Sequence, residues 1–167
     1  MIEINTVDSE FNKLLDMECF TNDTKETVQK ADIAFLPDFN LRKGIERAFQ
    51  PDTINFYKYV KQKSNDYRVE IFENKEDVRI LSLHSFDIWL PTMWIANIIL
   101  LPIAINLVSS YVYDKLKGRN KDEATVQLRI VIEDKSKGKS ASIFYKGPGK
   151  ELKENFEKID ASKLWED

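Results

Sequence analysis

The sequence is poor in the residues that form chemical cross-links and flexible joints. Its 167 residues include one cysteine, one histidine, five glycines and five prolines. Because Cys19 is the only thiol, no disulfide can form within one chain, which suits a reducing compartment. A zinc site of the Cys/His type inside one chain is also excluded. The scarcity of glycine and proline argues against long flexible linkers.

Charge and targeting signals indicate a cytoplasmic protein. The first 15 residues contain neither a basic segment nor an apolar one, so no secretory signal is expected. The net charge is −3, but residues 1–39 hold nine acids and three lysines, whereas residues 114–150 hold ten basic residues and five acids. Such opposite patches can attract each other or a second copy, so we do not expect nucleic acid as the partner.

The first 66 residues are predicted to form a helical segment. Thr21, Asn22 or Asp23 offers a helix N-cap, and Glu26 is placed to complete a capping box. A second helix is expected where apolar residues recur at helical spacing: Leu41, Ile45, Ala48 and Phe49. A third helix is expected after Pro51, with Phe56, Tyr59 and Val60 on its core face.

Two β-hairpins are predicted in the rest of the chain. Alternating apolar and polar residues in 67–71 and 78–83, with NKED between them, predict the first hairpin. The same alternation in 125–133 and 140–146, around DKSKGK, predicts the second hairpin. A closing helix is expected over 147–159, because it contains one apolar stripe and a proline near its start.

These elements predict an α+β fold. We expect a four-stranded antiparallel sheet from two β-hairpins, in ββαββα order over residues 67–159, packed on a central apolar helix pair. The helical N-terminal segment, residues 1–66, would pack on the domain formed by residues 67–167. Together the two parts would make one compact unit.

A long uncharged run raises the question of a membrane span. No charged residue lies between Asp87 and Asp114, and residues 88–113 are long enough to cross the hydrocarbon core of a bilayer. Tryptophans near one end and tyrosines near the other are typical of membrane interfaces. These features favour a single-span or peripheral membrane protein anchored by the run.

Other features of the same run favour a soluble core. The basic residues directly behind it would keep its C-terminal side in the cytoplasm, so the whole structured N-terminal part would have to cross the membrane. Asparagines within the run are costly in lipid, and Pro91 and Pro102 each fit the first turn of a helix. We therefore predict two consecutive helices at the centre of a soluble domain, with membrane association as the alternative.

No motif in the sequence predicts catalysis strongly. His84 has serines and Asp87 nearby, but neighbouring strand positions face opposite sides, so a catalytic triad is not expected. Asp52 after Pro51, followed by Glu73 and Lys75, matches the loose letters of PD-(D/E)xK nucleases, which need both acids on neighbouring strands. Here Asp52 begins a helix and Glu73 enters a turn, so a metal-dependent nuclease-like enzyme is the weaker alternative.

A glycine-rich turn is the one candidate anion site. Gly147, Gly149 and Lys150 lie between a strand and a helix N-terminus, where free amides and a lysine can hold an anion. The segment has neither the Walker A spacing nor the GxGxxG pattern. A tight turn into the last helix is therefore the preferred interpretation, with anion binding as the weaker alternative.

The absence of a nucleophile–base pair, a metal cluster and a cofactor loop favours a non-enzymatic protein-interaction protein. No cofactor and no metal are expected. The partner would be another protein or a second copy of this chain, because residues 88–113 carry more apolar surface than a four-stranded sheet can cover. The residues predicted to contact it are Trp89, Trp94, Ile98 and Tyr111.

Overall fold

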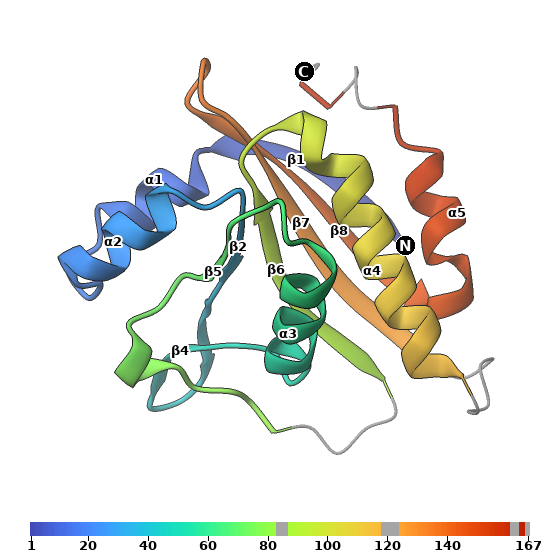
Figure 1. Ribbon diagram of the computed structural model, residues 1–167, viewed down its shortest axis with the longest axis horizontal. Helices are drawn as coiled ribbons and strands as arrows, with labels where there is room; N and C mark the ends of the chain where they lie inside the picture. Colours follow the sequence, from blue (N-terminus) through green and yellow to red (C-terminus); the bar gives the residue numbers. More distant parts are fainter. Residues whose placement is uncertain (83–86, 118–123, 161–163, 166–167) are drawn as a thin grey trace.

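The computed structural model describes residues 1–82, 87–117, 124–160 and 164–165. A six-stranded mixed sheet in the order β1-β8-β7-β6-β2-β5 forms its centre, and β3 and β4 form a second sheet (Figure 1). The strands are β1 Ile2–Asp8, β2 Ile33–Leu36, β3 Asp38–Arg42, β4 Ile45–Ala48, β5 Val69–Ile71, β6 Ile88–Ile95, β7 Thr125–Asp134 and β8 Lys139–Pro148. The α-helices are α1 Glu10–Leu15, α2 Asn22–Gln29, α3 Thr53–Lys63, α4 Leu101–Leu116 and α5 Leu152–Glu157. Short 3-10 helices are η1 Lys75–Asp77, η2 Ile98–Leu100 and η3 Gly149–Glu151.

The large sheet joins strands from distant parts of the chain. β7 and β8 form an antiparallel hairpin, and β1 adds to the outer side of β8, also antiparallel. β6 runs parallel to β7, with α4 as the connection between them. β2 pairs antiparallel with β6 and parallel with the short edge strand β5.

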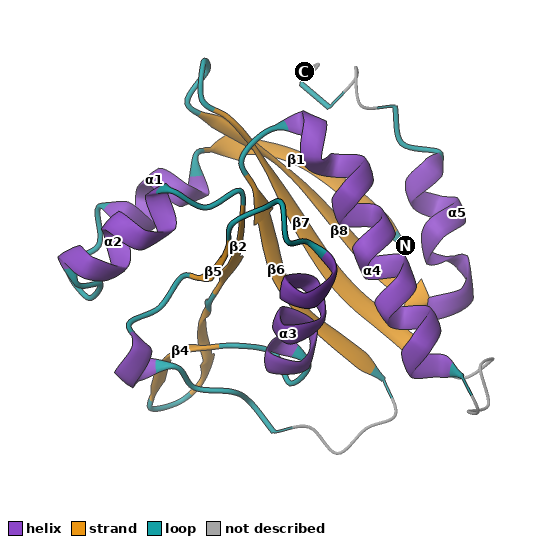
Figure 2. Ribbon diagram, viewed as in Figure 1, coloured by secondary structure: helices purple, strands orange, loops and turns teal. Residues whose placement is uncertain are grey.

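Helices cover the two faces of the sheet unequally. Figure 2 shows α3, α4 and α5 in front of the orange strands. Tyr145 of β8 contacts Phe156 of α5 on this face. On the opposite face, Phe11 of α1 stacks on Trp94 of β6 with ring centroids 4.1 Å apart. Successive strand residues alternate between these faces, so α1 and α4 pack against different side chains of β6.

The alternation of β7 follows this arrangement. Val126, Leu128, Ile130 and Ile132 are at most 1% exposed, as the sequence pattern predicts. Their polar neighbours lie on the other face of the sheet and are only half-buried in the first part of the strand. The second hairpin is therefore confirmed, with its turn at residues 135–138.

The uncharged run forms a strand and a helix instead of two helices. Residues 88–95 are β6, which lies between β7 and β2 and is covered on both faces. Pro102 lies in the first turn of α4, as predicted. Both faces of β6 are apolar because both are buried, so the strand shows no alternation. Among the described residues, one helical segment, Ile98–Leu116, is long and apolar enough to cross a membrane, and 39% of its most apolar window is buried in the protein.

The predicted four-stranded antiparallel sheet is wrong. β5 pairs with β2 in parallel and not with residues 78–82, the described part of the predicted second strand. The NKED segment folds into η1, and beyond it Ile80 makes only an isolated bridge to Phe49. The prediction of a first hairpin fails because short alternating segments also suit an edge strand followed by an extended loop. The alternation does not show which strand lies beside β5.

The helical N-terminal third is also wrong in part. The chain begins with β1, and the predicted helix over Leu41–Phe49 is the β3–β4 hairpin, turned by Gly44 with φ of 86°. The predicted helix after Pro51 is confirmed as α3, and Thr21 caps α2 by accepting a hydrogen bond from the Thr24 amide. Strands from both sides of residue 66 share the large sheet.

Candidate functional site

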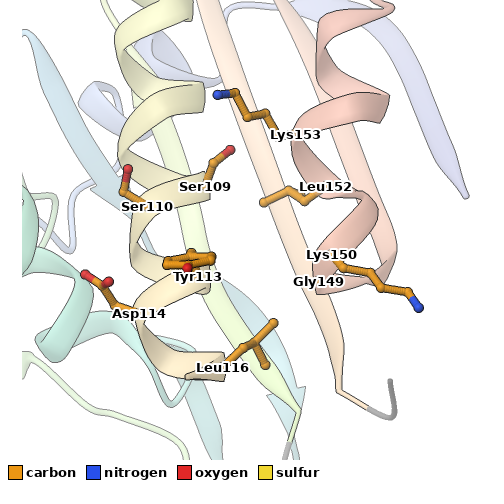
Figure 3. Close-up of a pocket in the computed structure, with 9 residues that line it drawn as sticks. All are labelled: Ser109, Ser110, Tyr113, Asp114, Leu116, Gly149, Lys150, Leu152 and Lys153. Carbon is orange, nitrogen blue, oxygen red and sulfur yellow. The ribbon is translucent and has the colours of Figure 1, made fainter. Parts of the chain in front are cut away.

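The predicted anion-binding residues lie where β8 leads through η3 into α5. Gly149 is buried, and its amide donates to the Ala124 carbonyl oxygen over 3.3 Å. Lys150 points away from the neighbouring groove between α4 and α5 (Figure 3). α5 has six residues, so its N-terminal dipole is short. The anion site stays a prediction, and close packing accounts for Gly149.

The groove between α4 and α5 has a volume of about 550 Å³. Ser109 of α4 lines it and points toward α5, and Lys153 of α5 reaches back toward α4 (Figure 3). The Ser109 hydroxyl oxygen is buried without a hydrogen-bond partner in the described part of the chain. Leu116 and Leu152 form the apolar floor where the two helices come together.

Replacing Gly149 by alanine is expected to lower the free energy of unfolding by about 1–3 kcal/mol. The new Cβ would lie 2.7 Å from Leu116 Cδ1 and 3.1 Å from Val112 Cγ1, two side chains that are themselves buried. Chemical denaturation would measure the loss. Ser110→Ala, an exposed change on α4, should stay within about 0.5 kcal/mol. Equal stability of the two variants would contradict the close packing.

The four predicted partner-contacting residues do not form one exposed patch. Trp94 and Tyr111 are 1% and 4% exposed inside the chain, whereas Trp89 and Ile98 are half-buried. Burial raises the pKa of Tyr111, and the neighbouring Asp52 adds to the shift. The most exposed apolar residue of this region is Ile99, at 78%.

The weak nuclease-like pattern is not assembled. Asp52 accepts hydrogen bonds from the Trp89 amide over 3.0 Å and from the Tyr111 hydroxyl over 3.2 Å. Glu73 instead pairs with Arg47 at the η1 end of the molecule. Within residues 1–82, 87–117, 124–160 and 164–165, no three acidic, histidine or cysteine side chains come together as metal ligands. His84 lies outside the described residues.

The charged cluster around Glu73 holds loops together. Arg47 donates from Nε and Nη2 to the two oxygens of Glu73, over 2.7 and 3.1 Å. Asn74 accepts from the Thr21 amide and from the Thr24 hydroxyl, and it donates to the Cys19 carbonyl oxygen. Each polar group thus has a protein partner, which is typical of a structural network.

A second hollow lies on the face of the sheet that α1 partly covers. It has a volume of about 520 Å³, and we call it the α1–β3 cleft. Its lining residues come from α1, β2, β3, β6, β7 and the connections between them: Glu10, Lys13, Leu14, Met17, Leu36, Pro37, Asp38, Phe39, Asn40, Thr92 and Arg129. The cleft therefore exists only when distant parts of the chain have folded together.

Charged side chains are held in place inside the cleft. Arg129 donates from Nε to the Ser142 hydroxyl over 2.8 Å and forms an ion pair with Glu10. Asp38 accepts from Gln50 Nε2 over 2.8 Å. Burial raises the pKa of Asp38, while the hydrogen bond from Gln50 and the charge of Arg129 act in the opposite direction. The carboxyl group is thus partly desolvated and close to a fixed cation.

Thr92 adds a polar group that the protein does not use. This residue is 6% exposed and lines the cleft. Its hydroxyl has no hydrogen-bond partner in the described part of the chain, yet it is not sealed from solvent. The hydroxyl can therefore bond to water or to a molecule in the cleft.

The outer edge of β1 is the third candidate surface. β1 has seven residues and, within the residues that the structure describes, pairs with β8 on one side only. Most of its residues are exposed, including Ile4 at 44%. On the face covered by α3, α4 and α5, the Thr6 hydroxyl donates to the Leu164 carbonyl oxygen over 3.1 Å. This hydrogen bond uses the Thr6 side chain and not its backbone groups.

Comparisons of the chain with models of protein families, with curated proteins and with solved structures found no match. The candidate surfaces are therefore defined by this chain's own geometry. The sequence pattern did not indicate the cleft, because its charged residues lie on separate elements. One signal was present: Arg129 stands on the polar side of an alternating strand.

Proposed function

We propose that this protein is a protein-interaction protein that pairs with a second copy of itself along the free edge of β1. The observation that carries the proposal is a long edge strand with an exposed apolar side chain, whose outward backbone groups have no partner among the described residues. Such an edge is a template for another strand.

The hydrogen bonds to β8 fix which residues of β1 face outward. Met1 and Lys146 exchange both backbone bonds, over 2.9 and 3.0 Å. In an antiparallel ladder, bonded and non-bonded pairs alternate. Residues 3, 5 and 7 therefore point their backbone groups toward β8. The amides and carbonyls of Ile2, Ile4, Thr6 and Asp8 point away from the sheet.

β1 lacks the usual features that block a sheet edge. Its sequence, IEINTVD, contains no lysine and no proline, and its register with β8 has no bulge. The opposite edge of the sheet is different, because β5 has only three residues. Natural proteins commonly blunt edges by shortness, proline, lysine or bulges. The contrast makes β1 the edge that can accept a strand.

A second copy fits this edge in one antiparallel register. If Ile4 lies opposite Ile4 of the partner copy, Ile2 lies opposite Thr6 and Glu3 lies opposite Asn5. The outward backbone groups of both strands then meet, and no two like charges are directly opposed. Shifting the register by two residues in one direction would place Glu3 opposite Glu3, which is unfavourable.

Light scattering at high micromolar concentration tests the proposal. The wild-type chain, of 19.5 kDa, is expected at twice that mass. Ile4→Pro should give a monomer, because proline removes an outward amide and leaves every β1–β8 bond intact. Thermal unfolding of the diluted variant checks that it remains folded.

A matched control separates this edge from the apolar helix surface. Ile99→Lys changes the most exposed apolar residue of the 88–113 region and should leave the dimer intact. Loss of the dimer in Ile99→Lys but not in Ile4→Pro would place the interface at η2 instead. A wild-type monomer at high micromolar concentration would refute self-association.

A further inference from the structure

The α1–β3 cleft has the properties of a binding site and not of a packing defect. Thr92 is 6% exposed and lines the cleft, and its hydroxyl makes no hydrogen bond within the described part of the chain. At the rim, Asn40 adopts a left-handed φ of 56°, which asparagine tolerates and which fits the irregular register of the β3–β4 hairpin. A mostly apolar cleft with a few polar groups fixed in its wall is the usual form of a small-molecule site.

The charges of the lining restrict the class of ligand. The cleft contains two carboxylates, Glu10 and Asp38, and two cations, Lys13 and Arg129. Because the lining is neutral in sum, a ligand with a large net charge would leave one sign uncompensated in a partly buried space. A ligand that is neutral in sum but carries both signs suits this lining.

The hydrogen-bonding groups that remain unused in the cleft indicate where the positive and the negative group of such a ligand would bind. Oδ2 of Asp38 accepts from Gln50, and Oδ1 has no partner in the described part of the chain, so it is available to an ammonium group. A guanidinium has five N–H donors, and Arg129 uses Nε for Ser142 and one Nη2 donor for Glu10. The other donors are available to a carboxylate, and the Thr92 hydroxyl is available to either group.

Apolar side chains form the rest of the wall. Leu14 and Leu36 are 7% and 3% exposed, and Met17 and Phe39 are half-buried beside them. A volume of about 520 Å³ is within the range of small-molecule sites, which is ~300–1,000 Å³. The space is therefore sufficient for a small ligand with one apolar group.

We infer that the α1–β3 cleft binds a free α-amino acid with an apolar side chain. Asp38 receives its ammonium group, Arg129 receives its carboxylate, and Thr92 bonds to one of the two. The side chain lies against Leu14 and its apolar neighbours. This site is separate from the β1 edge and does not depend on self-association.

Isothermal titration of the full chain with each of the standard amino acids tests the inference. Leucine, methionine or phenylalanine is expected to bind saturably. For the best ligand, the analogue lacking the carboxylate and the analogue lacking the amine should each bind at least tenfold more weakly. The absence of saturable binding by any amino acid at millimolar concentration would overturn the inference.

Variants assign the binding to the cleft. Asp38→Asn removes the charge and Thr92→Val removes the hydroxyl at nearly constant volume, and each should weaken binding at least tenfold. Asp16→Asn makes the same chemical change on an exposed residue outside the cleft and should bind as the wild type does. The unfolding midpoint of each variant confirms that it is folded. Unchanged affinity in Asp38→Asn would place the ligand elsewhere and refute the site.

A further arm distinguishes free amino acids from peptide ends. Two further compounds carry the side chain of the best ligand. Its dipeptide moves the ammonium and carboxylate groups apart, and its N-acetylated amide removes both charges. Both should bind more weakly than the free amino acid. Tighter binding of the dipeptide would overturn the assignment in favour of a peptide terminus.

Discussion

Arg47→Met is expected to lower the free energy of unfolding by about 3–5 kcal/mol, the usual cost of removing one partner from a buried ion pair. The Glu73 side chain is 1% exposed, and Arg47 compensates its charge with two hydrogen bonds. Methionine retains most of the apolar stem of Arg47. It lacks the guanidinium, whose carbon lies 5.1 Å from the centre of the Phe20 ring, and this weaker contact is lost as well. The loss therefore comes mainly from leaving the carboxylate unpaired. Chemical denaturation measures it.

A second substitution should recover most of this stability. The double variant Arg47→Met/Glu73→Gln removes the buried charge. In the wild type, Glu73 accepts a hydrogen bond from the Asn74 amide over 2.9 Å, and the side-chain oxygen of glutamine can still accept this bond. Glu46→Gln, at a neighbouring carboxylate whose side chain is 72% exposed, should change stability by less than about 0.5 kcal/mol. If Arg47→Met costs no more than Glu46→Gln, the pair does not stabilise the fold.

Phe11→Ala is expected to cost a similar amount, about 3–5 kcal/mol. Phe11 is 6% exposed, stacks on Trp94 and meets Phe72 edge to face at 5.3 Å. It is the main apolar anchor of the short helix α1, whose N-cap Ser9 also bonds to the buried Glu133. Thermal and chemical unfolding would both register the loss.

A smaller reduction of the side chain at position 11 provides the control. Phe11→Leu keeps most of the buried volume and should cost clearly less than alanine. Both variants should remain folded, because α3, α4 and α5 pack on the other face of the sheet. A loss below about 1 kcal/mol for Phe11→Ala would mean that α1 contributes little to stability.

Local signals in the sequence predicted the elements that depend on local chemistry. The Thr21 cap, the helix α3 and the β7–β8 hairpin all follow from capping residues, helical spacing or alternation. Each of these signals needs only neighbouring residues. The same kind of reasoning placed Pro102 at the start of α4.

The remaining elements depend on contacts that the sequence does not show. β6 and β2 are buried on both faces, so they read as continuous apolar stretches that resemble a buried helix. In the β3–β4 hairpin, apolar residues recur at helical spacing by coincidence, and Leu41 is in fact 44% exposed. The cleft was missed for a related reason, since Glu10 and Arg129 meet only through tertiary structure.

The pairing of β1 with β8 also has a consequence for how the chain folds. This ladder sets Ile2 beside Tyr145, and β8 in turn holds the centre of the sheet through β7. Contacts between such distant residues slow folding, because a long loop must close before they form. During synthesis, β1 has no partner in this sheet until β8 has emerged. Until then both edges of the strand are exposed, and a chaperone or a neighbouring chain can reach them.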